Sequence, residues 1–172
     1  MNLEHVSAGP PSRLHARRFT TDDLSERDRV AAWREFFGRS VLRTDIEPIP
    51  DLAFHADMTL RALPGLRTIS GVISGARSAR TRELIADGNN DLGLFVNLTG
   101  TRIVCGQGRE VTLGAGDAVV QSCAEVATFT HSSRARFVGF RLPHPALAPL
   151  ISAPQHGIVQ GASPHESQEI AH

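Results

Sequence analysis

Histidine, cysteine and arginine are the side chains of this sequence that could carry chemistry, and their spacing limits what that chemistry could be. Neither Cys105 nor Cys123 pairs with a histidine in a recognisable way, and the Gly-x-Ser-x-Gly sequence of serine hydrolases does not occur. All 18 basic positions are arginine and there is no tyrosine, which excludes a Schiff-base lysine and a tyrosine acid. We therefore expect no enzyme, and two reduced, buried cysteines; a redox pair on neighbouring strands is the alternative.

The histidines do not form the cluster that a metal ion needs. His55 and His131 are two isolated imidazoles, and His156, His165 and His172 follow at intervals of nine and seven residues. A protein metal site normally uses three or four ligands held in a fixed geometry. The sequence predicts no bound metal and no cofactor.

The composition is that of a single neutral domain. The chain has 172 residues, enough to bury a core without disulfides. Its 18 positive and 18 negative side chains give no net charge and a pI of about 7.1. Nucleic-acid-binding modules usually carry a basic face, so we expect no direct DNA binding by this chain. The absence of a signal-peptide pattern or of a run of roughly 20 apolar residues predicts a cytoplasmic protein without a membrane partner.

The elements that must position these side chains begin with one amphipathic helix. Residues 1–18 contain Gly-Pro-Pro and several arginines and predict a flexible arm. Ser25 followed three residues later by an acid is the pattern of a helix start. Trp33 and Phe37 then share one helical face, and Gly38 is expected to end the helix. We expect Trp33 to anchor the core.

From residue 54 onward the sequence predicts short strands separated by turns. Phe54 to Leu60 alternates apolar and polar residues, and Pro64-Gly65 separates it from a strand that begins at Leu66. Turn residues that recur about every 8–12 positions are typical of a β-sandwich or barrel. Further strands are predicted at 92–98, 102–105, 109–113, 118–123, 126–131 and 136–142.

The turn Gly114-Ala115-Gly116-Asp117 is the most informative short motif. Gly116 supplies the positive φ that a type II turn requires at its third position, and Asp117 can bond the nearby backbone. The pattern of strand, turn and strand resembles the Pro-Gly-Asp signature of cupin barrels, with Ala115 in place of the usual proline. The resemblance implies a mainly β fold, a cupin-like jelly-roll barrel with the N-terminal amphipathic helix packed against it.

Five further segments, in this order, resemble the N-terminal ligand-binding domain of AraC-type bacterial transcriptional regulators. They are Phe19–Leu24, Arg29–Arg34, Arg80–Asp87, Asn97–Gly100 and Arg141–Pro143, and the resemblance covers residues 17–151. In those regulators this domain binds a small effector or forms dimers, and separate helix-turn-helix units bind DNA. The resemblance implies an effector-binding domain without its own DNA-binding half, as a stand-alone sensor, a truncated regulator or a fragment.

The candidate ligand contacts follow from the strands and from this resemblance. Phe95 and Asn97 share one face of their strand, which is expected to line the barrel, with Asn97 orienting the ligand. Arg80 lies within a resembling segment, would share one face of a strand with Arg82, and is a candidate contact for an anion. The alternative is a solvated or intersubunit salt-bridged face, with Glu83 and Asp87 close by in the sequence. His131 lies in the general region where cupin enzymes carry a late metal-ligating histidine, but its register after Asp117 does not match and the earlier His-x-His half of that pattern is absent. We keep His131 as a ligand contact and assign no metal ligand.

Three functions are consistent with the sequence. The preferred one is a small-molecule-sensing and dimerisation domain at residues 19–151, followed by an irregular tail at 152–172, with an effector and a second copy of the chain as partners. A metal-dependent cupin enzyme is the second, and metal content would distinguish it. The third is a module that pairs with a full-length regulator and binds no small molecule.

Overall fold

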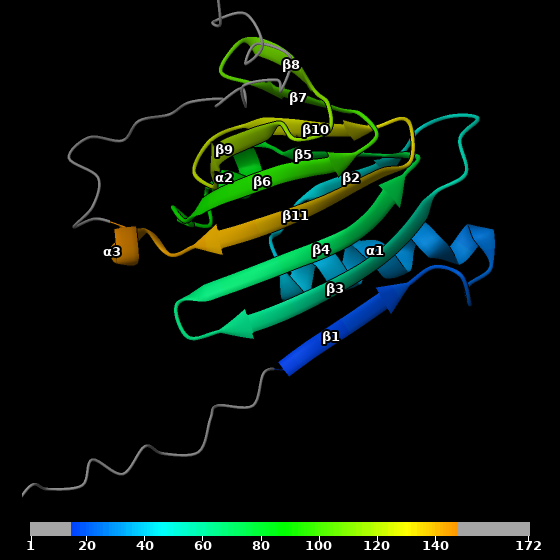
Figure 1. Ribbon diagram of the computed structural model, residues 1–172, viewed down its shortest axis with the longest axis horizontal. Coiled ribbons are helices and arrows are strands. Elements are labelled where there is room, and N and C mark those ends of the chain that lie inside the picture. Colours follow the sequence, from blue (N-terminus) through cyan, green and yellow to red (C-terminus); the bar gives the residue numbers. More distant parts are fainter. Residues whose placement is uncertain (1–14, 148–172) are drawn as a thin grey trace, which may run out of the picture.

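The computed structural model describes residues 15–147, which form two antiparallel sheets and three helices (Figure 1). The six-stranded sheet has the order β1-β3-β4-β11-β6-β9, with bounds His15–Thr20, His55–Leu63, Leu66–Ser74, Ala135–Leu142, Leu92–Thr99 and Ala118–Ser122. The five-stranded sheet has the order β2-β5-β10-β7-β8, with bounds Asp45–Pro48, Ala76–Arg80, Ala127–His131, Arg102–Gly106 and Arg109–Leu113.

The mainly β prediction is confirmed. All six strands predicted between residues 92 and 142 are present, and each end lies within one residue of its predicted position. Between residues 15 and 147 no strand pairing joins one sheet to the other, so β1, β9, β2 and β8 remain edge strands and the pairing does not close a barrel. No helix in this part of the chain combines the length and the apolar character needed to span a bilayer.

Helix α1, Glu26–Ser40, covers one end of the six-stranded sheet. Trp33 is 1% exposed and packs against four phenyl rings, those of Phe19, Phe36, Phe37 and Phe54, at centroid separations of 5.1–6.4 Å. The predicted end at Gly38 is wrong, because this glycine keeps a negative φ and the helix continues to Ser40. Ser25 stands at the start as predicted, but its hydroxyl bonds the Asp28 carboxylate, at 2.5 Å, instead of a backbone amide.

The N-terminal arm is shorter than predicted. Residues 15–18 belong to β1, which pairs with β3 from His15 opposite Ala62 to Thr20 opposite Asp57. Arg18 donates from Nε and Nη2 to the two carboxylate oxygens of Asp57, at 3.0 and 2.9 Å, which fixes this register. Residues 1–14 and the tail at 152–172 lie outside the described residues, so these predictions remain predictions.

The inner face of the six-stranded sheet is covered in two different ways. We call the cluster around Trp33, under α1, the helix-covered interior; it includes Ala56, Met58, Leu60, Ile69 and, next to the other sheet, Phe137. The sheet-covered interior lies against the five-stranded sheet and contains Val104, Leu113 and Val119. In Figure 1, α1 lies next to β3 and β4, while β7 and β8 stand at the opposite end of the domain. Phe95 packs against both regions.

Candidate ligand-binding site

Arg102 is a buried cation in the sheet-covered interior. It begins β7, and strand alternation places its side chain on the same face as Val104, which is also buried. Its neighbour across the sheet is Leu113, which is fully buried. Arg102 is therefore only 2% exposed, between two sheets whose facing residues are largely apolar.

Aromatic rings from both sheets surround the guanidinium of Arg102. Its Cζ lies 4.1 Å from the ring centroid of Phe137, 5.9 Å from that of Phe95 and 6.0 Å from that of Phe129. Phe137 and Phe95 belong to the six-stranded sheet, and Phe129 belongs to β10 beside β7. A cation over an aromatic face at these distances is stabilised by about 0.5–2 kcal/mol.

The polar edge of this guanidinium is not compensated. Among the described residues, no group accepts a hydrogen bond from Nε or Nη2 of Arg102. Burial lowers the pKa of Arg102 from its ordinary value to about 10, so the side chain stays charged at neutral pH. Burying a cation costs several kcal/mol even after relaxation, more than the aromatic rings return. A buried, charged guanidinium therefore lacks an acceptor for its Nε and Nη2 donors among the described residues.

His131, predicted as a ligand contact, lies beside the same rings. It is 4% exposed, its ring stacks on Phe137 with centroids 6.1 Å apart, and its Nδ1 has no partner in the described part of the chain. Burial lowers the pKa of His131 well below 6.5, and the charge of Arg102 lowers it further. The imidazole is therefore neutral at pH 7 and presents one unused ring nitrogen.

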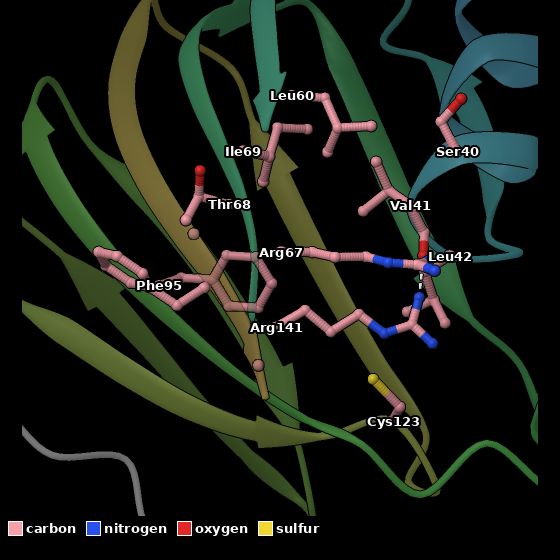
Figure 2. A pocket seen from close by; sticks show the side chains of 13 residues that line it. Ser40, Val41, Leu42, Leu60, Arg67, Thr68, Ile69, Phe95, Cys123 and Arg141 are labelled. Atoms are coloured by element: carbon pink, nitrogen blue, oxygen red, sulfur yellow. Dashed lines mark hydrogen bonds between the residues drawn. The ribbon is translucent and has the colours of Figure 1, made fainter. Parts of the chain in front are cut away.

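A small cavity is lined in part by Phe95 (Figure 2). Its walls are mainly apolar and come from α1's end, β3, β4, β6 and β11; they include Val41, Leu42, Leu60, Ile69 and Phe140. Its volume of about 30 Å³ holds one or two water molecules. Phe95 is predicted as a ligand contact, and the structure places its ring against both this cavity and Arg102.

Two glycines provide the space that the Phe95 ring occupies. A Cβ atom on Gly139, which pairs with Phe95 across the sheet, would lie 2.8 Å from Cδ1 of the ring. A Cβ atom on Gly93 would lie 2.7 Å from Cε2. Both distances are shorter than a van der Waals contact, so the position of the ring depends on these residues being glycine.

Two arginines stand at the cavity wall (Figure 2). Arg141 donates from Nε to Asp91, at 2.6 Å, and from Nη1 to the carbonyl oxygen of Val41, the residue that ends α1. Arg67 is exposed to solvent. Arg141 therefore ties the end of the helix to β11 directly beside the cavity.

Asn97, the predicted orienting group, is fully buried, and its donors are committed to the backbone. Its Nδ2 donates to the carbonyl oxygens of Gly100, at 2.8 Å, and Gly114, at 3.0 Å. Its own backbone groups bond Asp117 and Gly116. Gly116 has a φ of 90° and Asp117 accepts a bond from the Gly114 amide, as the turn prediction requires. Asn97 thus holds this turn onto β6, and only its Oδ1 has no partner among the described residues.

Arg80, the predicted anion contact, is likewise committed to the fold. Its Nε, Nη1 and Nη2 donate to the Cys123 carbonyl, the Arg43 carbonyl and the Asp87 carboxylate at 3.1, 2.9 and 2.6 Å. The expectation that Arg80 and Arg82 share one strand face is wrong: β5 ends at Arg80, and Thr81 caps the short helix α2, Arg82–Ile85.

The remaining chemical candidates lie apart from one another. Within residues 15–147 no three metal-ligating side chains converge, and His55 bonds Asp22 at 3.1 Å on the outside of β3. Cys105 lies in β7 and Cys123 follows β9 in the other sheet, so the neighbouring-strand redox pair is wrong. Burial raises the pKa of the Cys123 thiol, which lowers its reactivity.

Sequence reasoning missed three members of this site. Arg102, Phe129 and Phe137 were assigned to strands but not to the interior. The available signal was the alternation Arg102, Val104 in one short strand, which puts a cation on the apolar face.

Two antiparallel sheets enclose a partly polar interior, and comparisons with known proteins identify the family of this domain. The sequence matches the AraC-binding-like domain over residues 33–162, so this chain belongs to that family. No curated protein matches the sequence.

A solved structure shares this fold. The AraC-like transcriptional activator CuxR has a TM-score of 0.64 and 18% identity, covering 77% of this chain and 49% of that chain. This chain thus spans about half of that activator. The EutQ protein of Clostridium difficile has a TM-score of 0.44 at 16% identity over 58% of this chain and 76% of its own. A cupin 2 conserved barrel domain protein from Salinispora arenicola CNS-205 has 0.42 at 14% identity, over 60% and 87%.

Proposed function

We propose that this domain senses a small molecule that binds in its interior at Phe95. The observation that carries the proposal is that one residue, Phe95, both lines an apolar cavity and contacts the buried Arg102, whose Nε and Nη2 have no partner among the described residues. Ligand sites in proteins are mostly apolar with a few converging polar groups, and this interior has that composition.

Binding must change the conformation of the domain. A ligand-sized site has about 300–1,000 Å³, whereas the cavity has about 30 Å³. A ligand therefore binds only an arrangement in which Phe95 or the connection after α1 has moved. Such a difference in affinity between two arrangements is what allows a ligand to shift an equilibrium.

We expect the end of α1 to transmit this conformational change to the rest of the domain. Val41 and Leu42 line the cavity, and Arg141 holds Val41 to the sheet. We propose that ligand-dependent movement here biases pairing with a second copy of the chain and so serves transcription regulation, without direct DNA binding by this domain. Arg102 supports a binding role over catalysis, because a group with a pKa of about 10 is poorly matched to proton transfer at neutral pH.

A screen of small molecules by thermal shift tests this function. Leu42→Trp places an indole at the cavity wall, and Leu98→Trp places the same indole at a leucine that is 44% exposed on β6. A ligand at a hundred times its Kd stabilises a protein by about 2.7 kcal/mol. We expect compounds that raise the Tm of the wild type and of Leu98→Trp but not of Leu42→Trp. A screen without stabilising compounds, or an equal response of Leu42→Trp, would contradict the proposal.

A further inference from the structure

Nε and Nη2 of Arg102 form one edge of the guanidinium, and this edge points to the chemical class of the ligand. The two N–H groups of that edge are parallel donors, spaced to match the two oxygens of a carboxylate. We infer that Arg102 binds an organic carboxylate between the two sheets through this edge. The inference rests on the proposed sensing function and adds the ligand's charge and its contact.

The surroundings favour a monocarboxylate with an apolar body over phosphate. A phosphate group has more oxygens and more charge than one guanidinium edge can satisfy. The nearby unpartnered atom from the described residues is Nδ1 of His131. The other walls are the rings of Phe95, Phe129 and Phe137 and the apolar side chains of the cavity, which suit an aliphatic or aromatic body.

Other arginines near the interior are less suited to this role. Arg80 has an acceptor for each of its three nitrogens, and Arg141 is bonded to Asp91 and to the Val41 carbonyl. Arg67 lines the cavity but is exposed, so water already solvates its charge. Arg102 alone among these four combines burial with an unpartnered edge.

Phe95 lines the cavity and contacts Arg102, so we expect its ring to turn when the ligand binds. Its ring lies over Gly93 and Gly139, which have no side chains to hold it from below. A carboxylate whose body fills the cavity and the space left by the ring reaches the Arg102 edge with its charged end. The ligand's charge is then buried against an opposite charge and no longer unpaired.

Isothermal titration calorimetry with two matched pairs of probes tests this inference. Benzoate and hexanoate carry the charge, while benzamide and hexanamide have the same bodies without it; inorganic phosphate is the fifth probe. The variants are Arg102→Met, which removes the charge, and Arg102→Lys, which keeps it but lacks the paired edge. Arg136→Met is the control, because Arg136 is exposed on β11 and its loss changes the net charge equally.

We expect at least one carboxylate to bind the wild type and Arg136→Met with equal Kd. Arg102→Met should raise that Kd by about 10- to 100-fold, which is the range for a charge-assisted pair of hydrogen bonds. Arg102→Lys should recover part of the loss, and each amide should bind about tenfold more weakly than its acid or worse. Arg102→Lys also keeps the test valid if Arg102→Met does not fold.

Four results would overturn the inference. Equal binding of acids and amides would leave the sensing function in place and remove its preference for anions. Loss of binding in Arg67→Met with retention in Arg102→Met would move the contact to the exposed arginine. Binding of phosphate in preference to both acids, or binding of neither acid, would show that the ligand is not a carboxylate of this kind. The thermal-shift screen with Leu42→Trp tests the sensing function separately.

Discussion

The helix-covered and sheet-covered interiors pack against the same sheet but differ in what they bury. Under α1 the side chains are apolar, and the unpartnered polar atom described there is the neutral Nε1 of Trp33. Against the five-stranded sheet the interior contains a charged guanidinium and a neutral imidazole. A marginally stable domain tolerates such a cost only in part of its core. We therefore expect the helix-covered part to supply stability, whereas the sheet-covered part contains the proposed ligand contact.

The largest expected effect is in the helix-covered interior. Trp33→Ala removes the indole that touches four rings, and we expect a loss of about 3–5 kcal/mol in the free energy of unfolding. Urea denaturation followed by circular dichroism measures it. A loss below about 1 kcal/mol would mean that the two interiors do not differ in stability as described.

Two buried arginines sharpen the comparison at smaller magnitude. Arg80→Met leaves two backbone carbonyls and the Asp87 carboxylate without their donor. It should lower the free energy of unfolding by about 2–3 kcal/mol. Arg102→Met replaces an unpaired cation with an apolar side chain and should leave the free energy of unfolding unchanged or raise it. Urea denaturation of both variants, followed by circular dichroism, measures these two changes in the free energy of unfolding. Similar losses in both would show that Arg102 is a structural residue like Arg80.

The smallest effect is a pH dependence from His131. Its pKa is lowered in the folded protein, so protonation favours unfolding; its contribution is complete above about pH 6.5 and is lost as the pH falls. The slope can reach about 1.4 kcal/mol per pH unit, with Arg102 as the charged group facing it. His131→Phe should flatten stability between pH 7 and 5.

An unchanged slope in His131→Phe would assign the acid sensitivity to other groups. Asp57 and Asp87 do not contribute in this window, since their arginine partners lower their pKa values from 3.8. Their stabilisation is present above that value and is lost only at lower pH.

Local patterns predicted most strands, because alternation and glycine turns are visible within a few residues. Phe54, Ala56, Met58 and Leu60 are all buried, as their spacing indicates. The sequence does not predict β2 and β5, because Asp45–Pro48 and Ala76–Arg80 contain too few large apolar residues to show an alternation of apolar and polar side chains. They are stabilised by strand pairing instead: β2 pairs with β5, and β5 also pairs with β10.

The candidate site was predictable only in part, because its partners come from distant segments. Phe95 and His131 lie in the interior, but Arg80 reaches the carbonyl of Cys123, 43 positions away, which no local pattern shows. An arginine at the start of a strand usually faces water. Arg102 is buried instead, because Phe137 and Phe95 of the other sheet pack against its guanidinium.

The shared position of Phe95 limits how such a domain can acquire a new ligand during evolution. Because one ring packs against both interiors, a larger residue on either side changes the space available on the other. Substituting Gly93 or Gly139 displaces the same ring, so neither glycine can vary independently of it. Mutations at these three positions should therefore be epistatic, and a change of ligand would require them to be selected together.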